Sequence, residues 1–117
     1  MKDTATAIDN LVLRERWIDE GVEPPSDACK TKAKNICALL YECYDILPEE
    51  IDATKEGGVY ISYRDIKRTL DIEVYNDLDI AVILADDREI IAAKDGIVDN
   101  DPIVEAFVRG VELWQLR

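Results

Sequence analysis

The chain has 117 residues, 48% of them hydrophobic and 34% charged, a composition that predicts one folded domain and excludes a disordered chain. Its net charge of −12, from 26 acidic and 14 basic residues, disfavours direct binding to nucleic acid, because a polyanion gains nothing from counterion release at phosphates. No apolar run approaches the ~18 residues of a membrane span, and the N-terminus lacks the pattern of a secretory signal, so we expect a cytoplasmic protein that does not bind membranes.

Residues 1–47 carry the pattern of helices. A threonine near the start, Thr4 or Thr6, can cap a first helix, and Gly21 is expected to end it. The apolar residues of this helix recur at helical spacing and are Ile8, Leu11, Val12 and Ile18. The dipeptide Pro24-Pro25 then forbids continuation of the helix.

A second helix is predicted after these prolines. Ser26 is expected to cap it, with Asp27 in the first turn, where the helix dipole favours an acidic residue, and Pro48 ends the segment. Its apolar stripe, at spacings of three and four residues, consists of Cys29, Ala33, Ile36, Cys37, Leu40 and Tyr44.

After Pro48 the hydrophobic period changes from helical to twofold. Strands are predicted over residues 58–63, 69–75, 80–84 and 88–93. The clearest of them is 69–75, where apolar residues alternate with mostly acidic ones, so that one face is buried and the other is solvated. Short links between successive strands favour an antiparallel meander.

The sequence Asp101-Pro102 is typical of a helix cap followed by proline at the first helical position. The apolar face of this third helix, which suits packing on the sheet, consists of Ile103, Val104, Phe107, Val108, Val111 and Trp114. We therefore predict an α+β fold with two N-terminal helices, an antiparallel three- to four-stranded meander and a C-terminal helix packed on the sheet. It forms a single domain, 1–117, with a helical part (1–47), a sheet (48–99) and the C-terminal helix (100–117).

Catalytic signals are sparse, and we predict no enzyme, no cofactor and no metal site. Histidine is absent, which removes the commonest general base and transition-metal ligand. Cys29 and Cys37 fall on the apolar stripe and are expected in the core, whereas Cys43 lies off it. The acid clusters match no calcium loop, and turn formation or helix capping explains most of them, including residues 99–101.

The acidity is concentrated in the second part of the chain, since residues 1–46 carry a net charge of −3 and residues 47–117 a net charge of −9. Acidic strand faces and turns would steer a basic protein electrostatically. Trp17 lies beside the stripe of the first helix, so we expect a partly exposed side chain available to a partner or to a homodimer. The predicted partner-binding residues are Asp71, Glu73, Asp77, Asp79, Asp86, Asp87, Glu89 and Trp17.

These features favour a non-catalytic binding protein of the antitoxin, immunity or inhibitor kind, acting on a basic protein partner. The first alternative is a DNA mimic that occupies a nucleic-acid-binding channel, which requires acids spaced like phosphates along one face. The second is an enzyme that uses carboxylates alone, which requires two acids sharing a cleft.

Three stretches, Pro24-Pro25-Ser26, residues 57–61 and residues 70–77, resemble a broad set of small uncharacterised bacterial proteins. Those sequences pair a helical part ending in Pro-Pro with a Gly-Gly-Val strand and an Ile-Glu-x-x-Asn hairpin, and the resemblance spans residues 22–84. It implies the meander and a bacterial or mobile-element source, and it implies no catalytic residues. The hairpin here reads Asn76-Asp77-Leu78-Asp79 where the resembling sequences have Asn-x-Gly-x, so its turn is expected to be longer or differently shaped.

Overall fold

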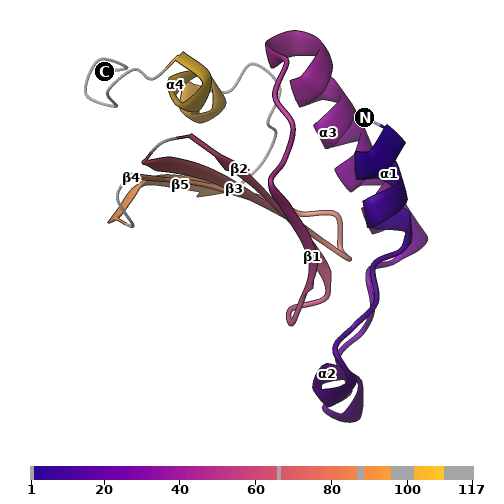
Figure 1. Ribbon diagram of the computed structural model, residues 1–117. Helices are drawn as coiled ribbons and strands as arrows, with labels where there is room; N and C mark the ends of the chain where they lie inside the picture. Colours follow the sequence, from indigo (N-terminus) through magenta and orange to yellow (C-terminus); the bar gives the residue numbers. More distant parts are fainter. Residues whose placement is uncertain (1, 66, 87–88, 96–101, 110–117) are drawn as a thin grey trace.

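The computed structural model describes residues 2–65, 67–86, 89–95 and 102–109, and these form an α+β fold (Figure 1). In chain order its elements are α1 (Lys2–Asp9), α2 (Glu15–Asp19), α3 (Asp27–Tyr44), β1 (Glu50–Thr54), β2 (Gly58–Arg64), β3 (Arg68–Tyr75), β4 (Ile80–Asp86), β5 (Glu89–Asp95) and α4 (Pro102–Arg109). Figure 1 shows α1, α3 and α4 on the same side of the sheet, while α2 lies apart from it.

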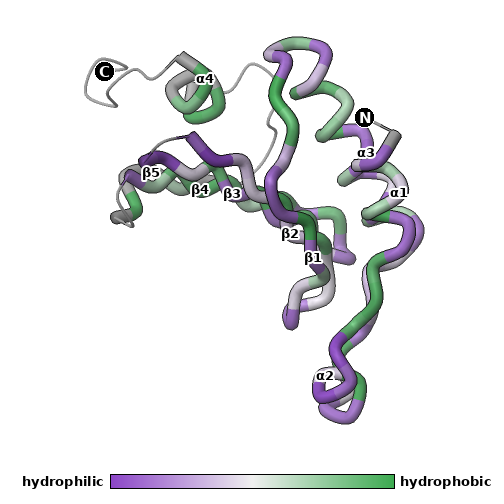
Figure 2. The backbone as a smooth tube through the Cα atoms, in the orientation of Figure 1, coloured by the Kyte–Doolittle hydropathy of each residue, from purple (hydrophilic) through white to green (hydrophobic). Residues whose placement is uncertain are grey.

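The sheet is an antiparallel meander with the strand order β1-β2-β3-β4-β5, which confirms the predicted meander but has five strands where three to four were predicted. Ile61 pairs with Ile72, and Ile72 pairs with Val82, so the apolar residues of the central strands share one face. Figure 2 shows the resulting alternation of hydrophobic and hydrophilic residues along the strands. Strand β1 precedes the strands expected from the sequence; it was missed because only Ile51 and Ala53 are apolar in its five residues.

Helix α3 covers the apolar face of the sheet and packs on β2 and β3. The hydroxyl of Ser26 accepts a hydrogen bond from the Cys29 amide at 3.1 Å, so the predicted cap is confirmed. The predicted stripe is also confirmed, because its first five residues are buried and Tyr44 is half-buried. Asp45 ends the helix in the left-handed conformation, with φ 57°.

The prediction of one helix that is capped by Thr4 or Thr6 and ends at Gly21 is wrong, since both threonines lie within α1 and the chain leaves the helical conformation after Asp9. The Lys30 ammonium donates to the backbone carbonyl oxygen of Asp9 at 3.1 Å, and Lys34 Nζ lies 2.8 Å from the Asp9 carboxylate, so two cations stabilise this helix end. The apolar periodicity continues past the end of α1, but Val12 is 78% exposed. Periodicity alone therefore overstated the length of this helix.

Helix α2 is a short second helix that buries none of its residues. Gly21 ends it with φ +81°, and its amide donates to the Ile18 carbonyl oxygen while the Val22 amide donates to that of Trp17. This pair of hydrogen bonds is a Schellman motif, which requires the left-handed residue that glycine supplies. Gly21 thus stops a helix as predicted, although the helix that it stops begins only at Glu15.

Helix α4 lies over β3 and β4, and its Val104 and Phe107 side chains are buried in the common core. The predicted cap Asp101, the acid cluster at 99–101 and the apolar residues Val111 and Trp114 lie outside the described residues. Within the described ranges, no helix is both long and apolar enough to cross a membrane.

Candidate protein-binding surface

The side of the sheet that faces away from α1, α3 and α4 is left uncovered by the described helices (Figure 1). Its side chains are those that alternate with the buried core residues along the strands. We call this surface the open face and define it by Glu50, Asp52, Tyr60, Ser62, Arg64, Asp71, Glu73, Tyr75 and Ile83. Four acids and one base make its net charge −3.

Asp71 forms the centre of a hydrogen-bonded cluster on the open face. Its Oδ1 atom accepts hydrogen bonds from Ser62 Oγ at 2.7 Å and from Tyr60 Oη at 3.1 Å. Burial raises the pKa of the Tyr60 hydroxyl, and the charge of Asp71 raises it further, so Tyr60 remains a neutral donor. The cluster therefore holds a carboxylate at a fixed place on the open face.

The acids of β1 lie beside this cluster and form exposed ion pairs. Arg64 Nη2 lies 3.4 Å from Glu50 Oε2, and Arg14 Nη2 lies 3.6 Å from Asp52 Oδ2. Because the Arg64 and Arg14 side chains are half exposed or more, these pairs contribute little to stability. Either arginine could therefore leave its carboxylate without a large loss of folding free energy.

Three chain segments meet at Asn76, beyond the end of β3. Asn76 Oδ1 accepts from the Ser26 amide at 2.8 Å, and Asn76 Nδ2 donates to the Pro24 carbonyl oxygen at 3.0 Å. The backbone amide of Asn76 also donates to the Gly57 carbonyl oxygen at 2.8 Å. Asn76 in the β3–β4 turn thus binds the start of α3 through its side chain and the β1–β2 turn through its backbone, an arrangement that we call the junction.

Both glycines at the β1–β2 turn, Gly57 within it and Gly58 at the start of β2, are required by their surroundings. Gly57 has φ +85°, and a Cβ there would lie 3.3 Å from Asn76 Nδ2. A Cβ at Gly58 would lie 2.2 Å from the Val74 carbonyl oxygen, which no real Cβ could tolerate. The stretches 24–26, 57–61 and 70–77 therefore meet at one place in the fold.

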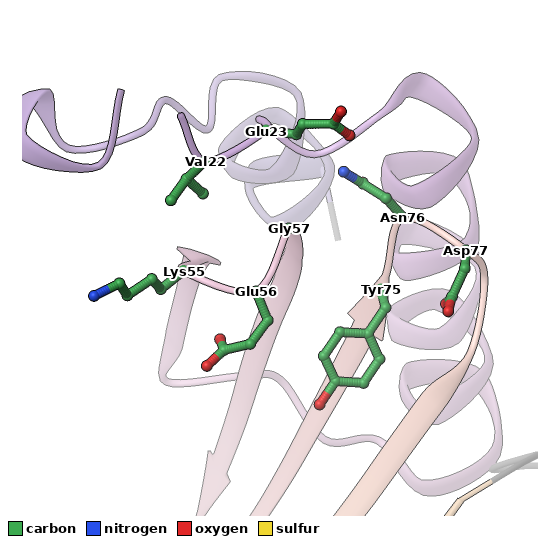
Figure 3. Close-up of a pocket in the computed structure, with 8 residues that line it drawn as sticks. All are labelled: Val22, Glu23, Lys55, Glu56, Gly57, Tyr75, Asn76 and Asp77. Atoms are coloured by element: carbon green, nitrogen blue, oxygen red, sulfur yellow. The ribbon is translucent and has the colours of Figure 1, made fainter. Parts of the chain in front are cut away.

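A pocket of about 410 Å³ opens beside the junction (Figure 3). Its walls come from the segment after α2 and from the two turns, and its lining residues are Val22, Glu23, Lys55, Glu56, Gly57, Tyr75, Asn76 and Asp77. In Figure 3, Glu56 and Tyr75 extend in the same direction, with Glu23 and Asn76 above them. We call this cavity the junction pocket; it adjoins the open face because Tyr75 belongs to both.

The structure places four of the predicted partner-binding residues in two pairs, one on β3 and one in the turn that follows it. Asp71 and Glu73 lie half-buried on the open face, and Asp77 and Asp79 are exposed in the β3–β4 turn. In that turn the Leu78 amide donates to the Tyr75 carbonyl oxygen, and Leu78 adopts φ 71°. The turn is therefore tight, with leucine in the left-handed conformation that glycine usually supplies, so the expected lengthening of the turn is not seen.

The other predicted residues lie elsewhere. Asp86 is on the helix-covered face opposite Arg68, which is 5% exposed and whose Nε lies 3.8 Å from Asp86 Oδ2. Asp87 and the side chain of Glu89 lie outside the described part of the chain. Trp17 is half-buried on α2, with the Arg14 guanidinium 5.0 Å from its ring centroid, and it is not on the open face.

The sequence did not single out four acids of these surfaces. Two belong to the open face, Glu50 and Asp52 on β1, and two line the junction pocket, Glu23 and Glu56. The alternation of polar and apolar residues over 50–54 could have indicated β1, and Gly57-Gly58 could have placed Glu56 in a turn. Nothing in the sequence pointed to Glu23, because its position depends on the long-range hydrogen bonds of Asn76.

No family model matches the chain, and no curated protein or solved structure shows significant similarity to it. Among the residues that the structure describes, no three histidine, cysteine, aspartate or glutamate side chains lie close enough to hold a metal ion. The function is therefore argued from the open face and the junction pocket themselves.

Proposed function

We propose that the chain is a non-catalytic binding protein of antitoxin, immunity or inhibitor type, whose open face binds a basic surface of a protein partner. The observation that carries the proposal is the fixed carboxylate of Asp71 among further acids on the uncovered side of the sheet. Charge complementarity of this kind speeds association with a basic partner and disfavours acidic ones.

The mixture of side chains on the open face favours binding to a basic protein surface. It is less suited to a mimic of DNA that occupies the channel of a nucleic-acid-binding protein. Acids stand in two groups, on β1 and on β3, and β2 between them contributes Arg64 but no acid. Ile83 of β4 and Ile90 of β5 add apolar surface, and Ile90 is 66% exposed. A patch of apolar and charged residues suits a protein interface, whereas a mimic of DNA requires a row of negative charges.

The test is an affinity pull-down from the native host with three forms of the chain at low and at high salt. The face variant is Asp71→Asn with Glu73→Gln, which removes two charges but keeps a hydrogen-bond acceptor for Ser62 and Tyr60. Its matched control is Glu42→Gln with Asp45→Asn, which removes the same charge from the exposed end of α3.

The expected result is one basic protein, identified by mass spectrometry, that the wild type and the control retain at low salt. The face variant should lose this protein, and high salt should release it from all forms, because exposed charges are screened beyond about 10 Å at ~0.1 M salt. Equal retention by the face variant and its control, or the absence of a specific partner at any salt, would refute the proposal.

A further inference from the structure

The junction pocket gathers an aromatic ring and an apolar wall beside carboxylates in one cavity. Tyr75 supplies the ring, Val22 the apolar wall, and Glu56 a carboxylate that extends alongside the ring (Figure 3). A cation above or beside an aromatic face is attracted by the ring quadrupole, and a carboxylate within reach adds a charge-assisted hydrogen bond. This combination matches a side chain with an aliphatic stem and a cationic head.

The charges around the pocket favour the same ligand. The pocket is lined by three acids, Glu23, Glu56 and Asp77, and by one base, Lys55. The Lys55 Nζ atom lies 3.3 Å from Glu20 Oε2. In Figure 3 the Lys55 side chain extends away from Tyr75. The cation that lines the pocket is therefore already paired with the Glu20 carboxylate, directly after α2, and the three acids remain to attract a cation from outside.

The walls of the pocket are held in place by hydrogen bonds of the junction. Asn76 fixes the segment that carries Glu23 through the Pro24 carbonyl oxygen, and it fixes the β1–β2 turn through Gly57. The Asp79 amide donates to Asp77 Oδ1 at 2.9 Å, which orders the remaining wall. A site assembled before the ligand arrives loses less entropy on binding than one that must form around it.

We propose that the junction pocket binds one cationic side chain of the partner, an arginine or a lysine, with its stem along Val22 and Tyr75 and its head at the Glu56 carboxylate. This inference rests on the proposed function, because a basic partner supplies the side chain. The pocket would then fix the position of the partner, while the open face supplies a less specific electrostatic attraction.

The probe is N-acetyl-arginine amide, titrated into the full chain at low salt and followed by amide chemical shifts. We expect saturable shifts at the Gly57 and Asn76 amides, with a dissociation constant on the order of 1 mM, and smaller ones at Asp71. N-acetyl-citrulline amide has nearly the same shape without the charge and should shift neither pocket amide.

Variants assign the binding to the pocket. Glu56→Gln and Tyr75→Leu should each weaken binding about two- to fivefold, whereas Glu42→Gln on α3 should leave it unchanged. Lys55→Gln should strengthen binding of the arginine probe, since this substitution removes a positive charge that repels the ligand. Shifts spread evenly over all acidic surfaces, shifts of equal size with citrulline, or equal effects of Glu56→Gln and Glu42→Gln would overturn the inference. If the pocket fails while retention of a basic protein still depends on Asp71 and Glu73, the proposed function stands without it.

Discussion

Substitution of Asn76 by alanine tests whether one side chain holds the junction together. The change removes an acceptor for the Ser26 amide and a donor for the Pro24 carbonyl oxygen. Both partners are exposed enough for water to replace the lost group, so each hydrogen bond contributes at the low end of the usual range. We expect the free energy of unfolding to fall by about 1–2 kcal/mol.

Two further variants make the measurement specific. Asn76→Asp keeps the acceptor for Ser26 but loses the donor to Pro24, so it should cost about half as much. Asn35→Ala removes an exposed asparagine from the middle of α3 and should change stability by less than about 0.5 kcal/mol, in the stabilising direction, because alanine is the better helix former.

Urea unfolding followed by circular dichroism gives these free energies. Hydrogen exchange gives an independent reading, because the Ser26 amide should lose protection in Asn76→Ala and keep it in Asn76→Asp. If Asn76→Ala is as stable as Asn35→Ala and the Ser26 amide stays protected, the side chain does not join the segments and the account of the junction is refuted.

Three other predictions concern single positions. Gly58→Ala should destabilise the fold by about 3 kcal/mol, because the Cβ of the alanine would lie 2.2 Å from the Val74 carbonyl oxygen. A variant with unchanged Tm would contradict this close contact. Leu78→Gly should raise the free energy of unfolding by about 1 kcal/mol in urea, since Leu78 has φ 71°, where glycine is not strained. A loss of stability would mean that the contacts of the leucine side chain outweigh this backbone strain. Burial raises the pKa of the Cys37 thiol from about 9 to about 11, so the folded state holds the proton more tightly. The unfolding free energy should therefore be unaffected by this group below about pH 9 and should fall as pH rises toward about 11. Cys37→Ala should reduce this loss of stability at high pH, whereas Cys43→Ala should not, because Cys43 is exposed. Equal stability–pH profiles of the two variants would contradict the assignment of the loss to Cys37.

The parts of the fold that the sequence could predict are those governed by local rules. The cap at Ser26 and the stripe along α3 follow from hydrogen-bonding chemistry and helical spacing, and both are confirmed. Strand β3 was predicted from simple alternation and has the same pattern of burial, with its bounds differing by one residue. The end of α1 depends instead on Lys30 and Lys34, which approach Asp9 from a different helix, so residue periodicity could not locate it.

The candidate site was predictable only where it follows strand alternation. Asp71 and Glu73 share a face because they are two residues apart, and this could be stated in advance. Asp86 was grouped with them from its charge, yet the strand register places it opposite Arg68 on the covered face. The junction pocket combines segments about 50 residues apart, which no local pattern brings together.

The geometry also links the two proposed binding elements. Acids on β1 and β3 are separated by one intervening strand, so the register fixes them roughly 10 Å apart across the sheet. Tyr75 continues the same face into the junction pocket, where Asn76 holds the surrounding turns. A partner that places one cationic side chain in the pocket therefore has its remaining basic residues aligned over carboxylates at fixed spacing. Because neither element must rearrange, binding would depend on the spacing of the partner's charges and not only on their number.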